Sequence, residues 1–546
     1  MKLKSFFYLL TVIVINNNRV LAQAGNLDST FGTNGIIKWI YGVGNVSVQQ
    51  DSNIILAGTI IDSPSTNNEF GAIRYTNNGI LDNTFGINGW TETQVGQCCD
   101  QAANSIIQKD GKIVIAGYCV DNSGKGDYTL LRYTPNGKLD NTFNGNGIVL
   151  TSFNTGGYAD YGFNVAIEPN GKIVQVGFGD DNSGSPHFGI ARYDSTGIID
   201  NTFGTNGKVL TSIMGLTYAA ATCVIVRPDG KIIAGGGSSN GNAPNCFALA
   251  QYNVDGSLDN TFGTGGEVTT FFGSGGSNGN VYDDDEEYDM VLQPDGKIIM
   301  VGNSILGTDT INTYNSAIAL ARYDTDGLLD TSFGEGGKVR TKIPKYDYFL
   351  GYGVAIQSDG KVLVSGFASD SFEASYPTFI LIRYQTNGLL DTTFGLKGVI
   401  VLLIDTFNSQ GGNIVIQSDG KILVSGRVNN PYLNFFGGYN FIVRFLSGLN
   451  TGILNFSVKQ NPILIYPNPI KLQATLQYTL SQNEQISIVL YDIRGRLVQT
   501  FISNQNRAQG EQKAQLDFSP TLSPGNYILS ISNGIGKQTI EISLVH

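Results

Sequence analysis

The chain has 546 residues, of which 41% are hydrophobic, so it can bury sizeable cores and is not a disordered chain. Its formal net charge of −11 excludes a protein built mainly to bind nucleic-acid phosphates, because that task needs a cationic surface. Glycine accounts for 70 residues without a Gly-X-Y period, which indicates many tight turns rather than collagen.

The N-terminus has the features of a signal peptide. Lys2 and Lys4 precede an apolar run over residues 6–15, which is too short to span a bilayer of about 30 Å. Small residues follow, and we expect residues 1–24 to be removed by cleavage after Ala22 or Ala24. No later segment has 18 uninterrupted apolar residues, so no membrane span is expected.

Export would permit disulfides, and the five cysteines leave two interpretations open. In the first, Cys98 or Cys99 pairs with Cys119, and Cys223 pairs with Cys246. In the second, all five are inert thiols.

A unit with a recurring Leu-Asp-x-Thr-Phe-Gly segment is repeated between residues 25 and 446. Each segment is followed by two apolar runs joined by a short turn, and then by an aromatic run that ends in Arg-Tyr in five copies, in Gln-Tyr in the fourth and in Arg-Phe in the seventh. Self-similarity at a nearly fixed spacing is typical of repeat architectures. The phenylalanines of the seven segments are Phe31, Phe85, Phe143, Phe203, Phe262, Phe333 and Phe394.

Each unit is expected to form four short strands. The two apolar runs flank Asp-Gly, as at 110–111, which predicts a two-residue hairpin because that turn needs positive φ. The Arg-Tyr run supplies a third strand, and runs such as 207–211 supply a fourth. Four strands repeated seven times predict an all-β fold, a seven-bladed β-propeller over residues 25–446.

The ends of the repeat region predict how the ring closes. The first copy opens with a lone strand of the fourth type, Ile36–Ile40, and the last copy ends after its third strand at Phe445. We therefore expect Ile36–Ile40 to complete the last blade, because closure covers two otherwise exposed sheet edges.

The repeated segments resemble the delta-sixty repeat of bacterial surface and secreted proteins. All seven copies keep the Asp and the Phe, whereas Asn144 replaces the Gly of one copy and Gln251 replaces the Arg of another. The resemblance covers about residues 25–446 and implies a propeller-like fold without implying an activity.

The remaining residues lack this period. Residues 447–461 contain Ser, Gly, Asn and Pro and are expected to be a linker. Short alternating runs separated by turns then predict a small Ig-like β-sandwich over residues 462–546.

Three motifs of this C-terminal part are similar to the type A sorting domain of type IX secretion in Bacteroidetes. The resemblance implies the type IX secretion machinery as a partner and export across the outer membrane. It further implies removal of the domain, with release or attachment at the outer-membrane surface. The alternative is a generic β-sandwich adhesion module. The motifs are Tyr466-Pro467-Asn468-Pro469, Leu490–Arg496 and Leu522–Tyr527.

The aspartate of each repeat is interpreted as structural. An Asp followed by Thr or Ser bonds its own backbone in a turn, and seven copies around a ring cannot converge on one ion. The third-strand arginines are expected to belong to the same framework, and each Phe to wedge between blades. The aspartates are Asp28, Asp82, Asp140, Asp200, Asp259, Asp330 and Asp391.

The sequence offers little for catalysis or for a cofactor. The only histidines are His187 and the terminal His546, which leaves no His-ligated metal site and no repeated Ser–His dyad. Calcium is the one ion considered, with Asp283, Asp285 and Glu287 as its ligands, against a solvated acidic loop.

The loops on one expected face of the ring differ between copies, whereas those on the other face are nearly identical. Divergent loops on a rigid scaffold are where binding usually resides, and aromatic side chains suit stacking on sugars or anchoring a peptide. We therefore expect a secreted or surface-attached protein that binds a glycan or a protein. The alternatives are a carboxylate-dependent polysaccharide hydrolase and a purely structural surface component. The candidate binding residues are Tyr158, Tyr161, Tyr218, Tyr346, Tyr348, Tyr352, Tyr376 and Tyr432.

Overall fold

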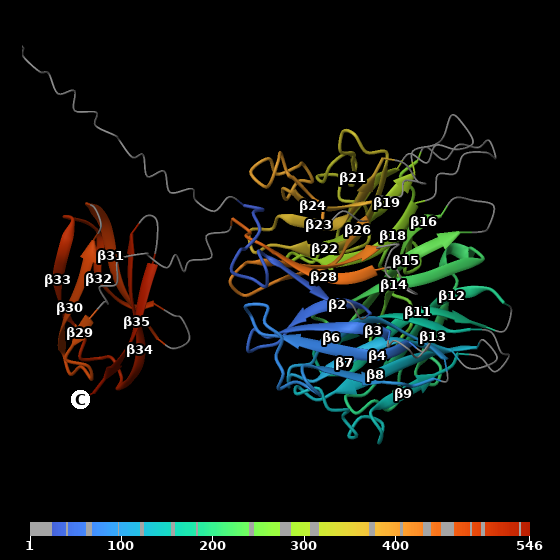
Figure 1. Ribbon diagram of the computed structural model, residues 1–546, viewed down its shortest axis with the longest axis horizontal. Coiled ribbons are helices and arrows are strands. Elements are labelled where there is room, and N and C mark those ends of the chain that lie inside the picture. The colour runs from blue at the N-terminus through green and yellow to red at the C-terminus, as the bar shows by residue number, and fades with distance from the viewer. Residues whose placement is uncertain are drawn as a thin grey trace, which may run out of the picture. The chain divides into compact units, whose positions relative to one another are not determined.

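The computed structural model comprises two compact units, Met1–Gly448 and Leu449–His546, and each is described by itself. Figure 1 labels their strands. Within the described residues, no helix is long and apolar enough to cross a membrane. The structure describes residues 24–39, 42–61, 68–96, 98–120, 125–153, 159–181, 184–239, 245–273, 285–305, 316–370, 377–404, 408–429, 438–448, 464–480, 483–492, 497–533 and 537–545.

The described part of the first unit forms seven antiparallel sheets of four strands, the blades of the predicted propeller. Blades 1 to 3 are β2 (Val43–Val48), β3 (Ile54–Ile61), β4 (Asn68–Tyr75) and β5 (Trp90–Thr93); β6 (Cys98–Ile107), β7 (Ile113–Val120), β8 (Gly126–Tyr133) and β9 (Ile148–Thr151); and β10 (Tyr161–Ile167), β11 (Ile173–Asp180), β12 (Pro186–Tyr193) and β13 (Lys208–Thr211). Blades 4 and 5 are β14 (Tyr218–Val226), β15 (Ile232–Ser239), β16 (Cys246–Tyr252) and β17 (Glu267–Thr270); and β18 (Asp285–Leu292), β19 (Ile298–Ile305), β20 (Ser316–Tyr323) and β21 (Lys338–Thr341). Blades 6 and 7 are β22 (Tyr348–Ile356), β23 (Val362–Ser369), β24 (Thr378–Tyr384) and β25 (Val399–Leu402); and β26 (Asn408–Ile416), β27 (Ile422–Asn429), β28 (Gly438–Phe445) and β1 (Ile36–Trp39).

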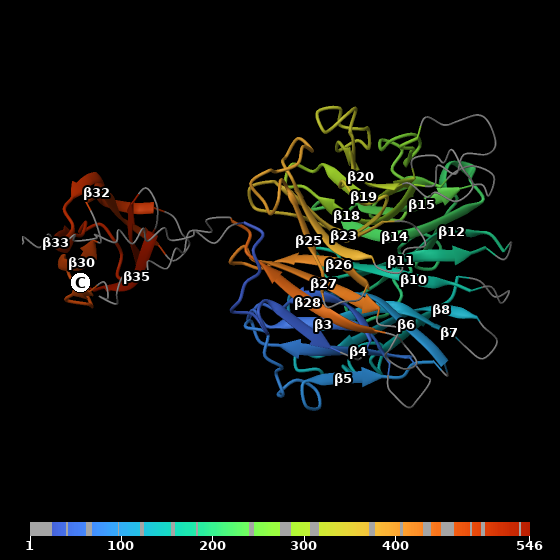
Figure 2. The same cartoon turned by 45° about the horizontal axis from the view of Figure 1, so that its top comes forward.

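The predicted ring closure is confirmed. β1 pairs with β28, so the start of the chain supplies the fourth strand of blade 7, in the register Ile36↔Val443. The first strands of successive blades contact one another, including β2 with β26, which places these strands innermost and joins blade 7 to blade 1. Figure 2 shows the blades following one another from blue to orange.

Alternating strand directions give the ring two faces. The hairpin face carries the turn between the first and second strands of each blade and the loop between the third and fourth. The divergent face carries the loops between the second and third strands and the connections between blades. A 3-10 turn, η1 (Ile213–Gly215), lies in the described part of one of these connections.

The hairpin turns differ from the predicted two-residue form. Gly111 N donates to Gln108 O at 2.9 Å and Gln108 N donates to Lys112 O at 2.8 Å, so the loop has three residues. Gly111 has φ of +82° whereas Asp110 is not among the positive-φ residues, which is the geometry of a type I turn followed by a bulge. Gly is thus required at one position of the turn rather than at both.

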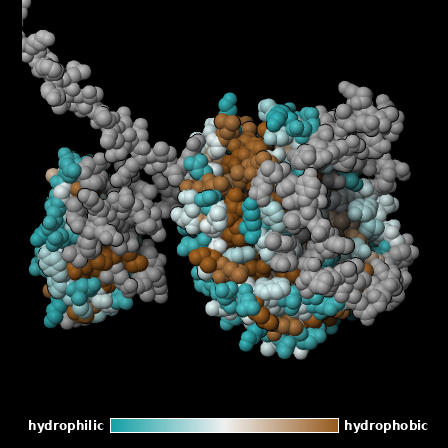
Figure 3. All heavy atoms as spheres, in the orientation of Figure 1, coloured by the Kyte–Doolittle hydropathy of each residue, from teal (hydrophilic) through white to brown (hydrophobic). Residues whose placement is uncertain are grey.

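The cores lie between neighbouring blades. The seven repeated Phe side chains are fully buried, and Phe143, for example, packs in a cluster that joins Val114 of blade 2 to Ile173 and Tyr193 of blade 3. Burying such a ring contributes about 1.5–3 kcal/mol. At the surface, apolar residues appear between hydrophilic ones (Figure 3).

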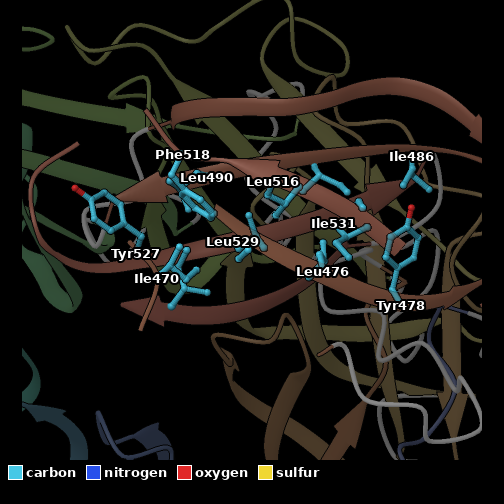
Figure 4. Packing of buried hydrophobic residues seen from close by; sticks show 14 of the residues in the cluster. Ile470, Leu476, Tyr478, Ile486, Leu490, Leu516, Phe518, Tyr527, Leu529 and Ile531 are labelled. Atoms are coloured by element: carbon cyan, nitrogen blue, oxygen red, sulfur yellow. The ribbon is translucent and has the colours of Figure 1, made fainter. Parts of the chain in front are cut away.

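The described part of the second unit is a sandwich of two antiparallel sheets. Leu476 and Leu516 from the three-stranded sheet pack against Leu490 and Leu529 from the four-stranded sheet, and Ile470, which pairs with the end of β35, completes the same core (Figure 4). The sheets are β29 (Leu464–Tyr466), β30 (Gln473–Leu480) and β33 (Gly510–Asp517); and β32 (Leu497–Arg507), β31 (Glu484–Asp492), β34 (Gly525–Asn533) and β35 (Lys537–Leu544).

Candidate functional site

The repeated aspartates lie on the hairpin face, each in a cluster of hydrogen bonds and ion pairs. Asp140 Oδ1 accepts from Thr142 N at 3.1 Å and from Thr142 Oγ1 at 2.6 Å, and Oδ2 lies 2.8 Å from Arg132 Nε and 3.2 Å from Lys112 Nζ. Burial alone would raise the pKa of Asp140, but the bonds from Thr142 and the two cations hold it at about 2. The corresponding ion pairs are Arg74–Asp82, Arg192–Asp200–Lys172, Lys231–Asp259, Arg322–Asp330–Lys297, Arg383–Asp391–Lys361 and Arg444–Asp28–Lys421.

The arginine of each cluster also joins its blade to the next. Arg192 Nη1 of blade 3 donates to Val254 O of blade 4, and its guanidinium lies 4.4 Å from the centroid of Phe203. Each of the six blades with this arginine is therefore tied to its neighbour by a guanidinium whose charge is neutralised by the repeated aspartate of its own cluster. The other bonds of this kind run from Arg74 to Pro135 O, Arg132 to Ser195 O, Arg322 to Thr386 O, Arg383 to Ser447 O and Arg444 to Asn77 O.

Blade 4 makes the same link with the residues exchanged. Gln251 stands where the other blades have Arg, and Arg227 stands where they have Gln or Glu, as at Gln108. Arg227 Nη1 donates to Gln251 Oε1 at 3.2 Å and to Thr325 O of blade 5 at 3.1 Å. The sequence interpretation noted Gln251 but missed its partner, although aligning the seven hairpins would have shown the lone Arg.

Most of the innermost strands carry a β-bulge, which lies near the start of β10 and near the middle of β14, β18 and β22. The extra residue is Phe163 in β10, Thr222 in β14, Tyr288 in β18 and Tyr352 in β22. A bulge twists a strand and re-aims a side chain, so these four strands depart from regular pairing at the bulged residues.

One aromatic cluster lies between blades 2 and 3. Tyr161 stacks on Tyr118 with ring centroids 4.2 Å apart, and Phe163 and Phe178 lie beside them at 5.8 Å from each other. All four side chains stay partly exposed. We call Tyr118, Tyr161, Phe163 and Phe178 the first aromatic cluster.

A second cluster lies between blades 5 and 6. Tyr288 and Tyr352 meet edge to face at 4.8 Å, and Phe367 lies 5.9 Å from both Tyr352 and Tyr348. The three tyrosines are partly exposed. We call Tyr288, Tyr348, Tyr352 and Phe367 the second aromatic cluster.

A polar residue follows or replaces the bulge in several blades. Asn45 Nδ2 donates to Ala103 O at 2.9 Å and Asn164 Nδ2 donates to Thr222 O at 3.0 Å, each reaching the next blade. Blade 5 has Asp289 instead, which accepts from Val354 N of blade 6 at 3.0 Å and from Met290 N at 2.9 Å. Burial raises the pKa of Asp289 to about 7 despite these two bonds.

The other candidate tyrosines lie in different surroundings. Tyr218 is 45% exposed at the start of β14. Tyr346 packs against the core of blades 5 and 6, 6.5 Å from Phe349, so it is a poorer candidate for a ligand contact. Tyr158, Tyr376 and Tyr432 lie outside the described residues.

The described residues contain no group of three or more His, Cys, Asp or Glu that could hold a metal ion. Asp283 lies outside them, and only the backbone of Asp285 and Glu287 is described, in β18. His187 lies in β12 with a side chain 13% exposed and Nε2 3.5 Å from Asp181 Oδ2.

Cys119, Cys223 and Cys246 are buried thiols, which agrees for these three with the interpretation as inert cysteines.

In the second unit, the motif Tyr466–Pro469 connects β29 to β30. Tyr466 is 46% exposed, and Asn468 Oδ1 accepts from Ser543 N at 3.0 Å. Ile470, which directly follows the motif, is fully buried, and its backbone bonds to Ser543 and Val545. The motif therefore holds the chain that follows β29 against β35, while the side chain of Tyr466 remains accessible to solvent.

Comparison with known families identifies both units. The DUF5122 β-propeller family, a domain of unknown function, matches residues 49–85, 108–143, 168–203, 227–262, 293–333 and 357–394. The secretion system C-terminal sorting domain matches residues 464–544. No curated protein matches the chain.

Solved structures resemble the chain only at low identity. PorZ, a surface component of the type IX secretion system of Porphyromonas gingivalis, is 10% identical with a TM-score of 0.32, covering 94% of this chain and 71% of its own. A PL25 ulvan lyase is 11% identical with a TM-score of 0.42, covering 77% and 96%. The Fusarium graminearum α-L-arabinofuranosidase Arb93A is 9% identical with a TM-score of 0.40, covering 78% and 97%. Similarity at this level carries no argument about activity.

The sorting domain indicates export to the cell surface or secretion and implies an interaction with the type IX secretion machinery. Six of the seven blades contain a matched repeat, and blade 7 is completed by β1. The chain thus contains DUF5122 β-propeller repeats within residues 49–394 and a secretion system C-terminal sorting domain at residues 464–544.

Proposed function

We propose that the exported propeller binds an extracellular glycan at the end of its central channel on the divergent face. The observation that carries this proposal is the pair of aromatic clusters on the first and second strands of the blades. Sugars present flat apolar C–H surfaces that pack on aromatic rings, and each such contact contributes modestly, about 0.5–1.5 kcal/mol beyond area burial. Several partly exposed rings on a rigid frame suit this mode of binding.

The positions of the clusters favour an extended ligand. The first cluster lies between blades 2 and 3 and the second between blades 5 and 6, so they are separated by blade 4 on one side and by blades 7 and 1 on the other. Blade 7 contributes Asn408, Gln410 and Asn413 to this end of its innermost strand. Amide groups beside aromatic rings can hydrogen-bond sugar hydroxyls while the rings stack.

The test uses one variant in each cluster. Tyr161→Ala and Tyr352→Ala are each expected to weaken binding of a neutral glycan, selected on an array with the purified full chain, by about threefold to tenfold. The combined variant is expected to abolish detectable binding by calorimetry. Ile87→Ala with Leu396→Ala is the control, because these side chains are 76% and 81% exposed in hairpin-face loops. Binding that is lost in the control and kept in the cluster variants would overturn the proposal.

A carboxylate-dependent hydrolase is the second candidate, and Asp289 is the observation that favours it. A carboxyl with a pKa of about 7 beside a glycan site suits a general acid. The reaction needs a second carboxyl about 5–10 Å away. Release of reducing ends from the bound glycan, lost in Asp289→Asn, would support hydrolysis, and binding without release supports a binding protein. An array without any glycan ligand would favour the purely structural role.

A further inference from the structure

A groove lies at the rim of the propeller, along the outermost strand of blade 5. It has a volume of about 910 Å³ and runs between β21 and the loop of blade 6 that contains Leu389. Leu389 is 61% exposed and gives the groove an apolar wall. Three cations from one short stretch of chain, Lys338, Arg340 and Lys342, line the same groove.

The repeat provides a second groove of the same construction. It has a volume of about 790 Å³ and lies between β13 of blade 3 and the equivalent loop of blade 4. In both grooves a lysine lies over a phenylalanine of the preceding connection. Lys208 Nζ is 5.8 Å from the Phe153 ring and Lys338 Nζ is 5.7 Å from the Phe272 ring. Lys208 also donates to Ser152 O and Lys338 to Phe271 O, so this lysine belongs to the shared framework.

The grooves differ in charge at the positions outside this framework. β13 continues from its lysine as Val-Leu-Thr-Ser, and β21 continues as Val-Arg-Thr-Lys, so Arg340 and Lys342 replace Leu210 and Ser212. Among the described residues that line the grooves, the blade 5 groove therefore has three cations and one carboxylate, that of Glu335, whereas the blade 3 groove has Lys208 and Asp255. This concentration of positive charge occurs in a chain with a net charge of −11.

Arg340 lines the groove with an exposed side chain. Its guanidinium lies 5.9 Å from the Phe272 centroid, and it forms no ion pair with any carboxylate of the described residues. Lys342 is exposed two residues further on, about 6.6 Å along an extended strand. Two cations at this spacing, beside an exposed apolar side chain, match a polymer that carries regularly spaced anions on apolar-faced rings.

We propose that the blade 5 groove binds an acidic polysaccharide, with its anionic groups on Arg340 and Lys342 and its sugar rings against Leu389. This site is separate from the channel end and goes beyond the glycan binding proposed there. An acidic peptide is disfavoured because β21 has four residues, and so short an edge strand gives little backbone pairing for strand addition.

The experiment measures binding of a galacturonate oligomer and of a neutral oligosaccharide of equal length to the purified full chain at two salt concentrations. The wild type is expected to bind the galacturonate oligomer, and more weakly at the higher salt, because exposed charges are screened. Arg340→Leu with Lys342→Ser copies the blade 3 groove and is expected to weaken this binding about tenfold. The reciprocal Leu210→Arg with Ser212→Lys is expected to add a second binding site. Leu210 and Arg340 lie on outermost strands, and Ser212 and Lys342 directly follow them. Unchanged melting of both variants therefore checks that the fold is kept.

Three results would overturn the proposal. The first is equal affinity of the wild type and the Arg340→Leu, Lys342→Ser variant for the galacturonate oligomer. The second is equal affinity of the wild type for the neutral oligomer. The third is tighter binding of polyglutamate than of the galacturonate oligomer, which would make the ligand a peptide. The Tyr161→Ala, Tyr352→Ala variant separates this site from the channel end, because it is expected to keep galacturonate binding while losing the neutral glycan.

Discussion

The two faces of the propeller are built on opposite plans. On the hairpin face the same Arg–Asp–Lys arrangement recurs around the ring, with Asp bonded to its own Thr or Ser and Arg bonded to the next blade. On the divergent face the corresponding positions hold an aromatic cluster in two junctions, small residues in blade 4 and amides in blade 7. The hairpin face therefore carries the bonds that hold the ring together, which leaves the divergent face free to vary in sequence.

The physical reason lies in what each kind of contact demands. A buried guanidinium must have its charge neutralised and its N–H groups bonded, so few substitutions are tolerated around it. Aromatic side chains at a bulge are held by packing and can be replaced by smaller ones with a local loss only. Substitutions on the divergent face are therefore expected to cost less stability than substitutions on the hairpin face.

The largest expected effect comes from removing one carboxylate of the hairpin face. Asp391→Asn leaves Arg383, whose side chain is 3% exposed, without its counter-charge, and should lower the free energy of unfolding by about 3–5 kcal/mol. Hydrogen bonds from Thr393 and the charge of Arg383 lower the pKa of Asp391 although burial opposes this, so its contribution is present above the unfolded pKa and is lost as pH falls through the folded pKa. Denaturant unfolding at pH 7 measures the difference. Asp359→Asn is the matched control, because this carboxylate pairs with the same Lys361 at the surface and should cost under about 1 kcal/mol. Equal losses in the two variants would contradict the distinction.

The exchanged pair in blade 4 gives the next effect. Arg227→Gln removes the bonds to Gln251 and to Thr325 O of blade 5, and should destabilise the propeller by about 1–3 kcal/mol. Gln251→Arg alone brings two guanidinium groups together and should also destabilise. The double variant restores the arrangement of the other blades, so its loss should be smaller than either single loss. Additive losses in a double-mutant cycle would show that the two positions are not coupled.

On the divergent face, the ionisation of Asp289 is expected to change the stability of the propeller with pH. Its folded pKa of about 7 lies above the unfolded value, so the folded state favours the protonated form and loses stability as pH rises from about 4 to 7. Asp289→Asn cannot ionise and should remove this pH dependence, so the wild type should lose about 1–2 kcal/mol of stability relative to the variant between pH 4 and pH 8. Melting of the two proteins across this pH range measures the difference. The reverse change, Asn164→Asp, should introduce the same pH dependence in blade 3, and a pH-independent difference in both would refute the assignment.

The seven-bladed fold was predictable because the repeated segments fix strand count and the position of Ile36 in blade 7. The sequence predicted which loops form the divergent face, but not how the aromatic side chains of that face are arranged. Tyr161 and Tyr352 were candidates from the sequence, yet their partners Tyr118 and Phe367 lie on second strands, outside the divergent loops from which the candidates were chosen. The bulges that bring them together shift the register by one residue and leave no mark in the alternation of apolar residues.

The hairpin turns were predicted at the right residues with the wrong type. Asp-Gly suits both a two-residue turn and a type I turn with a bulge, and the hydrogen bonds across the loop decide between them. The distinction matters at the one copy that lacks the Gly.

That copy supplies the smallest expected effect. In blade 1 the turn reads Asp51-Ser52, and Ser52 has φ of +69°, where the six other copies have Gly at φ between +81° and +90°. A side chain with Cβ is strained in this region by about 1–2 kcal/mol, and Ser52→Gly removes the strain while giving the unfolded chain more freedom. The net result should be a gain of about 0.5–1 kcal/mol, measured as a shift of the denaturation midpoint without a change in slope. Gly111→Ser in blade 2 is the matched opposite and should lose a similar amount, since the turn keeps the same bonds, Ser52 N to Gln49 O and Gly111 N to Gln108 O. A loss of stability in Ser52→Gly would mean that the Ser52 side chain makes a compensating contact. The turns of the hairpin face would then differ between copies in their contacts, which contradicts the uniform plan described for that face.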